Sequence, residues 1–207
     1  EEAEEAEGAE EAAMPKAQAA ANKDEADKRL AIASANVPPA NFKPLTEKEV
    51  LLARETLRAY SNAKAAAITK GKPEGCKVFR PDHVARQTMQ DQNKMINQPI
   101  GWGIPRGVEV GTRFPDRSSL IVLGVHKETM RGIASSLCHQ HRWAQSIVMS
   151  GGYENDEDQG DSCEYTGEGG NDFLGSGVQT NDQKLTGGNE ALANCITHRI
   201  PVRVVRK

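Results

Sequence analysis

The sequence predicts an α+β fold in which helices precede a sheet. Apolar residues recur at helical spacing within residues 46–67. Three later segments, at 120–125, 144–149 and 202–205, are short, apolar and rich in β-branched residues, which is typical of strands. Helices segregated from strands along a chain indicate the α+β class. The aromatic content of 4% and the mean hydropathy of −0.62 indicate a core that is small for 207 residues.

Residues 1–45 are expected to be a disordered acidic, Ala-rich tail and linker. Seven glutamates crowd the first dozen positions, and several prolines follow before residue 45. This composition buries too little apolar surface to fold alone. Leaving out these seven glutamates changes the formal net charge from −3 to +4, with 26 Lys and Arg against 22 remaining Asp and Glu. The rest of the chain is therefore mildly basic, which suits phosphate contacts, while the acidic tail leaves histones or nucleosomes open as partners.

Residues 46–98 are expected to form a helical leader. Thr46 and Glu49 make a capping box, and the first helix should run to about Ala67 and end before Gly71. Packing against the sheet is the expected role of this helix.

A second, weaker helix is expected to begin near Asp82. Val84 and Met89 should face inward, and the helix should end before Pro99. It is expected to complete the helical brace.

Residues 99–207 are expected to be mostly strands after Gly111. The three apolar segments named above are the predicted strands, and residues 189–193 are expected to form a short helix. The end of this region carries a cluster of basic residues: Arg199, Arg203, Arg206 and Lys207.

An acidic turn between two tyrosines is the most informative local feature. Tyr153 and Tyr165 flank a stretch that includes Asp156, with glycine pairs at both ends of residues 150–170. Aromatic faces can replace base stacking, at roughly 1–3 kcal/mol per base. A carboxylate accepts from the 4-amino group of cytosine but not from thymine, and glycines let backbone groups approach closely. The pattern fits a site for one flipped-out cytosine, although a plain solvated loop has the same composition.

Other site chemistries fit the sequence less well. A calcium loop lacks its glycine and terminal glutamate, and the Gly-Gly-Asn-Asp segment at 169–172 occurs once rather than as a repeat. The chain contains no apolar run of about 20 residues and no signal-peptide pattern. Four widely spaced cysteines (Cys76, Cys138, Cys163, Cys195) favour neither a zinc site nor a disulfide framework and fit a reducing compartment.

Several segments in order resemble one family, the SET- and RING-associated domain, also called the YDG domain. They are Ser-Ile-Val-Met-Ser-Gly-Gly-Tyr at 146–153, Tyr-Thr-Gly-Glu-Gly-Gly at 165–170, Asp-Gln-Lys-Leu at 182–185, Gly-Asn-Glu-Ala-Leu at 188–192 and Pro-Val-Arg-Val-Val-Arg at 201–206. Upstream, residues 104–111 and 124–127 look like the opening strands of that domain. The resemblance covers about residues 100–207.

The resemblance implies a curved, barrel-like β-sheet with flanking helices that reads methylated cytosine in DNA by flipping it out. It implies that Tyr153 and Tyr165 sandwich the base and that Asp156 accepts its amino hydrogen. The remaining edge of the base would be lined by Ser150, Gly151, Gly152 and Thr166.

Met130 falls where this family inserts a residue into the duplex. An unbranched, adaptable side chain suits wedging between bases. A gap-filling core methionine is the alternative for this position.

The chain departs from the family pattern in its finger loop and at its ends. Readers of hemimethylated DNA in the ubiquitin-ligase branch carry an Asn-Lys-Arg finger, whereas residues 171–181 contain neither lysine nor arginine, so strict hemimethyl-CG reading is not expected. The sequence starts with Glu and stops before the usual Tyr-Asp-Gly segment, which suggests a piece of a longer protein. The Arg-Glu-Thr-Leu-Arg string at 54–58 and Gly-Gly-Asn at 169–171 resemble plant SET-domain histone lysine methyltransferases.

The sequence therefore predicts a nuclear reader of double-stranded DNA carrying 5-methylcytosine. No catalytic residue, cofactor or metal, and no membrane partner, is expected on this chain. Three alternatives stay open: a fragment of a histone lysine methyltransferase (or of a ubiquitin ligase) whose effector domain lies elsewhere, a base-modifying DNA enzyme, and a purely structural chromatin module. A base-modifying enzyme would need a nucleophile or a metal-activated water, and the zinc-deaminase signature is absent from the sequence.

Overall fold

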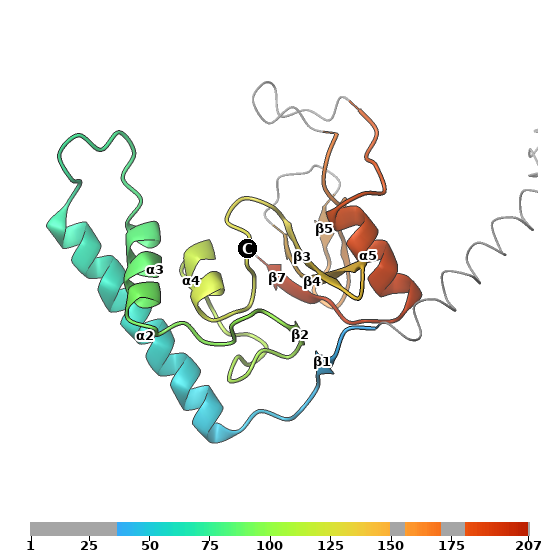
Figure 1. Cartoon of the computed structure of the whole chain (residues 1–207), viewed down its shortest axis with the longest axis horizontal. Helices are drawn as coiled ribbons and strands as arrows, with labels where there is room; N and C mark the ends of the chain where they lie inside the picture. The colour runs from blue at the N-terminus through green and yellow to red at the C-terminus, as the bar shows by residue number, and fades with distance from the viewer. Residues whose placement is uncertain (1–36, 150–155, 171–180, 207) are drawn as a thin grey trace, which may run out of the picture. The chain divides into compact units, whose positions relative to one another are not determined.

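The computed structural model describes residues 37–149, 156–170 and 181–206, and within them helices and small sheets form an α+β fold (Figure 1). The long helix α2 (Glu47–Lys70) begins at Thr46, whose hydroxyl accepts from the Glu49 amide while the Glu49 carboxylate accepts from the Thr46 amide. The helix ends where the Gly71 amide bonds to the carbonyls of Ala67 and Ile68. The predicted first helix is confirmed, with its end at Lys70. None of the described helices combines the length and the apolar character needed to cross a membrane.

Helix α3 (Pro81–Asp91) is the predicted second helix, but the prediction of which residues face inward was partly wrong. Ala85 and Met89 are buried, one helical turn apart, whereas the Val84 side chain is 43% exposed. Val84 and Met89 are five positions apart and therefore point to different sides of a helix. Sequence periodicity was too weak in this short helix to identify the correct face.

Helix α4 (Arg117–Val122) occupies part of the segment that we expected to be a strand at 120–125. The Asp116 carboxylate accepts from the Ser119 amide at 2.9 Å, which starts a helix one turn before the apolar run. A short, fully buried apolar run does not distinguish a strand from a buried helix. The local cap decides in favour of the helix.

The main sheet has the strand order β3-β4-β7. Strand β3 (Ile133–Cys138) pairs antiparallel with β4 (His141–Met149), and β7 (Arg203–Arg206) pairs parallel with β4. The β3–β4 hairpin turns at His139 and Gln140, which both adopt positive φ, as a tight two-residue hairpin requires. The strands predicted at 144–149 and 202–205 are confirmed, while β3 was missed because its serines interrupt the apolar pattern.

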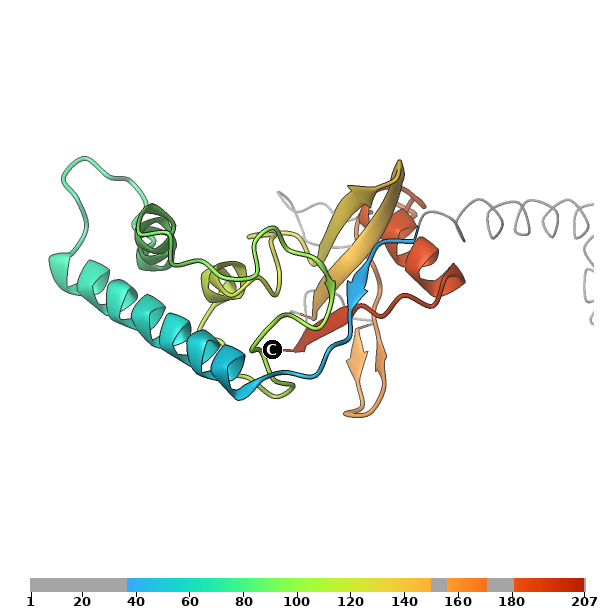
Figure 2. The ribbon, with the colours of Figure 1, turned by 60° about the horizontal axis from the view of Figure 1, so that its bottom comes forward.

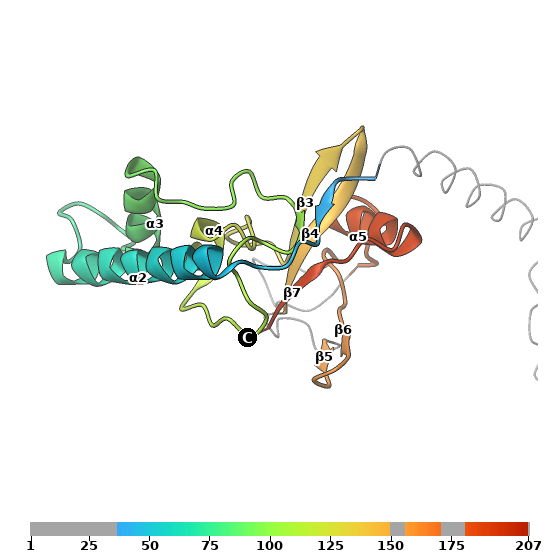
Figure 3. The same ribbon diagram turned by 90° about the horizontal axis from the view of Figure 1, so that it is seen from below.

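Two further sheets each consist of two strands of two residues. Strand β1 (Ala40–Asn41) pairs parallel with β2 (Trp102–Gly103), and β5 (Glu157–Asp158) pairs antiparallel with β6 (Cys163–Glu164). The β5–β6 hairpin stands apart from the main sheet (Figures 2 and 3). The expected opening strands at 104–111 and 124–127 are absent from this described part of the chain, where turns occupy both segments. The described strands form three separate sheets rather than a closed barrel.

Helix α5 (Gly188–Thr197) confirms the predicted helix at 189–193 and extends beyond it. It packs along β4: the Asn194 side chain donates to the Arg142 carbonyl at 2.9 Å and the Cys195 thiol to the Ala144 carbonyl at 3.5 Å. Because α5 covers one face of β4 and the core covers the other, β4 is buried on both sides from Trp143 to Met149 (Figure 1). This buried stretch includes the polar residues Gln145 and Ser146.

One core joins the leader helices to the rest of the described chain. Tyr60 of α2 and Met89 of α3 pack with Leu123 after α4 and with Val148 of β4. The leader is therefore part of the same packed unit as the sheet.

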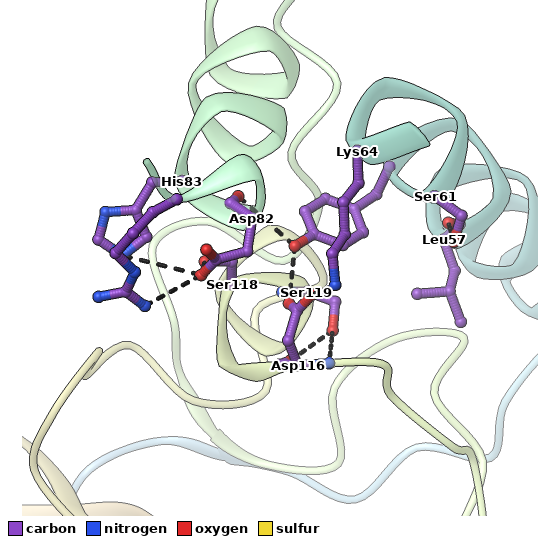
Figure 4. Close-up of polar contacts among 10 residues, drawn as sticks. Leu57, Ser61, Lys64, Asp82, His83, Asp116, Ser118 and Ser119 are labelled. Atoms are coloured by element: carbon purple, nitrogen blue, oxygen red, sulfur yellow. Dashed lines mark hydrogen bonds and ion pairs between the residues drawn. The ribbon is translucent and has the colours of Figure 1, made fainter. Parts of the chain in front are cut away.

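A polar cluster locks α2, α3 and α4 together beside that core (Figure 4). The Tyr60 hydroxyl and the Lys64 ammonium each lie 2.7 Å from an Asp116 carboxylate oxygen, and the Ser118 hydroxyl donates to Asp82 at 2.9 Å. Burial, followed by the Asp116 carboxylate, raises the pKa of Tyr60. Burial alone would raise the pKa of Asp116, but the hydrogen bonds from Lys64 and Tyr60 outweigh it and lower that pKa.

Candidate nucleic-acid interface

The β5–β6 hairpin brings Asp156 next to Thr166. Asp156 precedes β5 and Thr166 follows β6, and the Glu157–Glu164 pairing places their ends side by side. The Thr166 amide donates to Asp156 Oδ1 at 2.9 Å. The predicted site residues Ser150, Gly151, Gly152 and Tyr153 lie outside the described residues, directly after the end of β4 at Met149.

The Thr166 hydroxyl is a buried polar atom without a hydrogen-bond partner among the described residues. Leaving a buried hydroxyl unsatisfied costs roughly 1–3 kcal/mol, so such groups usually meet a ligand or water. The hydroxyl sits on the residue whose amide orients Asp156. A polar ligand edge at this position would therefore find both an acceptor and a hydroxyl.

Tyr165 lies against the start of β3. A Cβ added to Gly132, the residue before β3, would overlap the Tyr165 hydroxyl. The Gly132 carbonyl also accepts from the Val148 amide of β4 at 2.8 Å. Tyr165, the segment that leads into β3, and the end of β4 thus lie together at one end of the main sheet.

The segment after Thr166 is held by helix α5. The Glu168 amide donates to the Asn189 side-chain oxygen at 2.9 Å, and the Asn189 side-chain nitrogen donates back to the Glu168 carbonyl at 2.8 Å. The Glu168 carboxylate accepts from the Gly188 amide at 3.0 Å, so it supplies the acidic cap that Gly187 cannot provide. A side chain at Gly167 would collide with Asn189, and Gly167 adopts a φ of +87°.

These contacts between Glu168 and the first turn of α5, which we call the α5 clamp, were not predicted from the sequence. The Gly-Asn-Glu segment at 188–190 was informative only as part of a family resemblance, and no spacing rule pairs Asn189 with a residue twenty-one positions earlier. A glycine between Thr166 and Glu168 was the available signal of close approach.

Met130 projects from the loop between α4 and β3, and its side chain is 80% exposed. The alternative of a gap-filling core methionine is therefore wrong. At the start of this loop the Lys127 ammonium donates to the Ser135 carbonyl and to the Ser136 hydroxyl at 2.7 Å, and burial lowers the pKa of Lys127.

The basic cluster predicted at the C-terminal end is only partly available for phosphate. The Arg203 guanidinium donates to the carbonyls of Gln145, Gly101 and Gly103, and burial lowers its pKa to about 10. Arg206 lies 3.3 Å from Asp158 on the β5–β6 hairpin. Arg203 is thus a structural cation that ties β7 to the β2 region.

The fold is that of a known domain class. The family model for the SAD/SRA domain matches residues 102–207, and the chain belongs to that family. The resemblance expected from the sequence motifs, and the α+β fold expected with it, are confirmed.

Relatives named as histone methyltransferases share this part of the chain. The H3 lysine-9-specific methyltransferase SUVH6 of Arabidopsis thaliana is 37% identical over 165 residues, which is 74% of this chain and 21% of that protein. SUVH3 of Chlamydomonas reinhardtii is 46% identical over 111 residues, 52% of this chain and 11% of that protein. The chain thus spans about a fifth or less of the length of these two relatives.

Solved structures share the fold as well. The structure of KRYPTONITE in complex with mCHG DNA and SAH superposes with a TM-score of 0.66 at 30% identity, covering 76% of this chain and 34% of that one. SUVH6 of Arabidopsis thaliana in complex with SAM gives 0.62 at 34% identity, covering 77% of this chain and 32% of that one.

Proposed function

We propose that this domain binds double-stranded DNA carrying 5-methylcytosine and flips the methylated base into a pocket. Tyr153 and Tyr165 would stack on the base, and Asp156 would accept from its 4-amino group. Thr166 and the backbone of Ser150, Gly151 and Gly152 would meet the remaining edge. Methylated DNA as the ligand is supported by the similar KRYPTONITE structure, which is a complex with mCHG DNA.

The observation that carries the proposal is the pairing of Asp156 with Thr166. The Thr166 amide fixes one carboxylate oxygen, Oδ1, at 2.9 Å, which leaves Oδ2 as the acceptor for an amino group. The unpartnered Thr166 hydroxyl lies on the same residue. A carboxylate and a hydroxyl that share one anchor suit a base edge with alternating donors and acceptors.

The proposal also distinguishes a reader from a scaffold. A purely structural module would gain nothing from a buried, unpartnered hydroxyl beside an oriented carboxylate. A base-modifying enzyme would convert the bound nucleotide, so analysis of the DNA after incubation separates that alternative from simple binding.

The test is the substitution Asp156→Asn. The amide oxygen can still accept from the Thr166 amide, but the amide nitrogen would face the amino group of cytosine, donor against donor. Loss of this charge-assisted bond should cost roughly 1.5–3 kcal/mol, or about ten- to hundredfold in affinity for methylated duplex.

The matched control is Asp161→Asn, which removes the same charge from the exposed turn of the same hairpin. It should leave affinity within about twofold, as for an isolated rim charge. Equal affinity of Asp156→Asn and the parent protein would place the pocket elsewhere.

We further propose that the whole protein acts in the nucleus, where methyl-cytosine binding directs histone lysine methylation. The support is the naming of the relatives as H3 lysine-9 methyltransferases and the H3(1–15) peptide in a second KRYPTONITE structure. The measurement is methyl transfer by the whole protein to nucleosomes whose DNA is methylated or unmethylated. Equal transfer to both would contradict a targeting role.

A further inference from the structure

Two hydrogen bonds to one backbone carbonyl hold the C-terminal end of the loop that carries Met130. The Arg131 carbonyl accepts from Arg117 Nη1 at 2.7 Å and from His126 Nε2 at 3.2 Å. Arg117 is the first residue of α4, and His126 is fully buried after that helix. A carbonyl oxygen has two lone pairs, so both bonds can form together.

His126 connects this anchor to the main sheet. A carbonyl can only accept, so Nε2 carries the proton and Nδ1 accepts from the Ser146 hydroxyl of β4 at 2.9 Å. The imidazole therefore bridges β4 and the loop in a single tautomer. Burial lowers the pKa of His126 to about 4, which keeps this ring neutral near pH 7.

The anchored carbonyl lies between Met130, the residue that the family resemblance places in the duplex, and the proposed base pocket. Met130 precedes it and is 80% exposed, and Gly132 follows it and contacts the Tyr165 hydroxyl. Fixing the Arg131 carbonyl therefore fixes the spacing between an exposed apolar side chain and a tyrosine of the proposed base pocket.

We propose that Arg117 and His126 are positioning residues that hold the Met130 loop in the shape needed to enter DNA beside the flipped base. This inference rests on the proposed function. A loop that must be ordered on binding loses part of its contact energy to conformational entropy. Anchoring the loop beforehand removes that cost, so the two residues act through Met130 without having to touch DNA.

A direct contact between the Arg117 cation and a DNA phosphate is the competing explanation. The two explanations differ in how substitutions combine. If Arg117 acts through the loop, its effect disappears once Met130 is removed; if it binds phosphate itself, the two effects multiply.

The experiment is a double-mutant cycle with Arg117→Ala and Met130→Ala, read as affinity for a methylated duplex. Each single substitution should weaken binding about fivefold, equivalent to ~1 kcal/mol at ~1.4 kcal/mol per decade. The double variant should also be weakened about fivefold rather than about twenty-fivefold. Fluorescence of a 2-aminopurine next to the methylated cytosine should rise on binding of the parent protein and rise less with Arg117→Ala.

Several controls complete the cycle. Arg113→Ala removes an exposed arginine from the loop before α4 and should leave affinity unchanged. Melting temperatures report folding of each variant, and Arg117→Gln, which keeps most of the aliphatic stem, repeats the cycle should the alanine variant fail to fold. His126→Gln keeps a donor near the position of Nε2 and should bind more tightly than His126→Leu.

The outcomes separate this inference from the pocket proposal. Losses that multiply, or a Met130→Ala variant with parental affinity, would overturn the anchoring role while Asp156→Asn still weakens binding. Parental affinity of Asp156→Asn on the same duplex would instead overturn the pocket, and with it the inference that depends on it.

Discussion

Gly132 leaves room for the Tyr165 hydroxyl beside the candidate site. The residue has no positive φ, so its backbone suits any amino acid, yet a Cβ would overlap the Tyr165 hydroxyl. The requirement for glycine at this position is therefore imposed by a neighbour and not by the backbone.

Gly132→Ala should displace Tyr165 and weaken methyl-DNA binding while the domain stays folded. Losing part of one base–aromatic stack, worth roughly 1–3 kcal/mol when complete, should reduce affinity about fivefold. Gly101→Ala is the matched control, because Gly101 has open space around it and no positive φ. Fluorescence titration checks both; an unchanged affinity for Gly132→Ala would show that Tyr165 does not stack on the base.

His126 makes the stability of the domain depend on pH. Its pKa in the folded state is about 4, below the unfolded value of about 6.5, because the buried imidazole is disfavoured as a cation. Between these values the unfolded chain binds more protons, so the contribution of His126 is present above pH 6.5 and is lost as the pH falls. The pKa of His198 is also lowered by burial and acts in the same direction.

Through His126 alone, the free energy of unfolding should therefore fall by up to about 1.4 kcal/mol per pH unit as the pH is lowered from 6.5 toward 5. The pKa values of Asp82 and Asp116 are also lowered, so the stabilisation from these two carboxylates is lost only when the pH falls below about 4. Urea unfolding at several pH values measures the slope, and His126→Gln should flatten it. An equal slope in parent and variant would assign the effect to other groups.

At the scale of elements, helix α5 supports the pocket segment through its first turn. Asn189 exchanges two hydrogen bonds with the backbone of Glu168, two residues after Thr166. Asn194, farther along the same helix, donates to the Arg142 carbonyl of β4 instead. The two asparagines thus anchor α5 to different partners.

Asn189→Ala should weaken methyl-DNA binding about threefold to tenfold, because the Thr166–Glu168 segment loses its clamp. Asn194→Ala should lower the free energy of unfolding by ~1 kcal/mol for the lost hydrogen bond and change the affinity for DNA little. Thermal unfolding and DNA titration of both variants test this difference. Equal effects of the two substitutions on binding would mean that α5 contributes only general stability.

Local signals in the sequence predicted some elements and not others. The Thr46–Glu49 capping box and the apolar face of α2 are contained within one helix, and the prediction for that helix is confirmed. The cap at Asp116 also lies in the sequence, but its partners Tyr60 and Lys64 come from another helix, and the buried run after it resembles a strand. Tertiary burial, which periodicity does not encode, decided that element.

The residues of the candidate site were likewise predicted only in part. Asp156 and Tyr165 were predicted from a local motif and Thr166 from the family resemblance, and the structure brings Asp156 and Thr166 into contact. The supporting contacts join residues far apart in the chain, such as Arg117 with Arg131 and Glu168 with Asn189. Such pairs follow from the fold and carry no spacing that a single sequence displays.

At the scale of the whole described chain, the leader helices and the sheet share one core. The contacts of Asp116 with Tyr60 and Lys64 join α2 to the start of α4, while Arg203 of β7 donates to backbone carbonyls of β4 and of the segment around β2. Arg203 is committed to structure and Arg206 is paired with Asp158, so these two arginines are less available to contact phosphate. Base recognition must then supply much of the selectivity.

The strength of that selectivity is limited by the methyl group itself. Burying one methyl is worth about 0.8 kcal/mol, which is about fourfold in affinity. Residues 171–181 contain no lysine or arginine to inspect the opposite strand, so hemimethylated CG, fully methylated CG and methylated non-CG duplexes should bind about equally well.

The most direct test is a titration of the 207-residue protein with duplexes that differ only in methylation of one cytosine, at one salt concentration. The methylated duplex should bind about fourfold to tenfold more tightly than the unmethylated one, in CG and non-CG contexts alike. Equal affinity for methylated and unmethylated DNA would contradict the account.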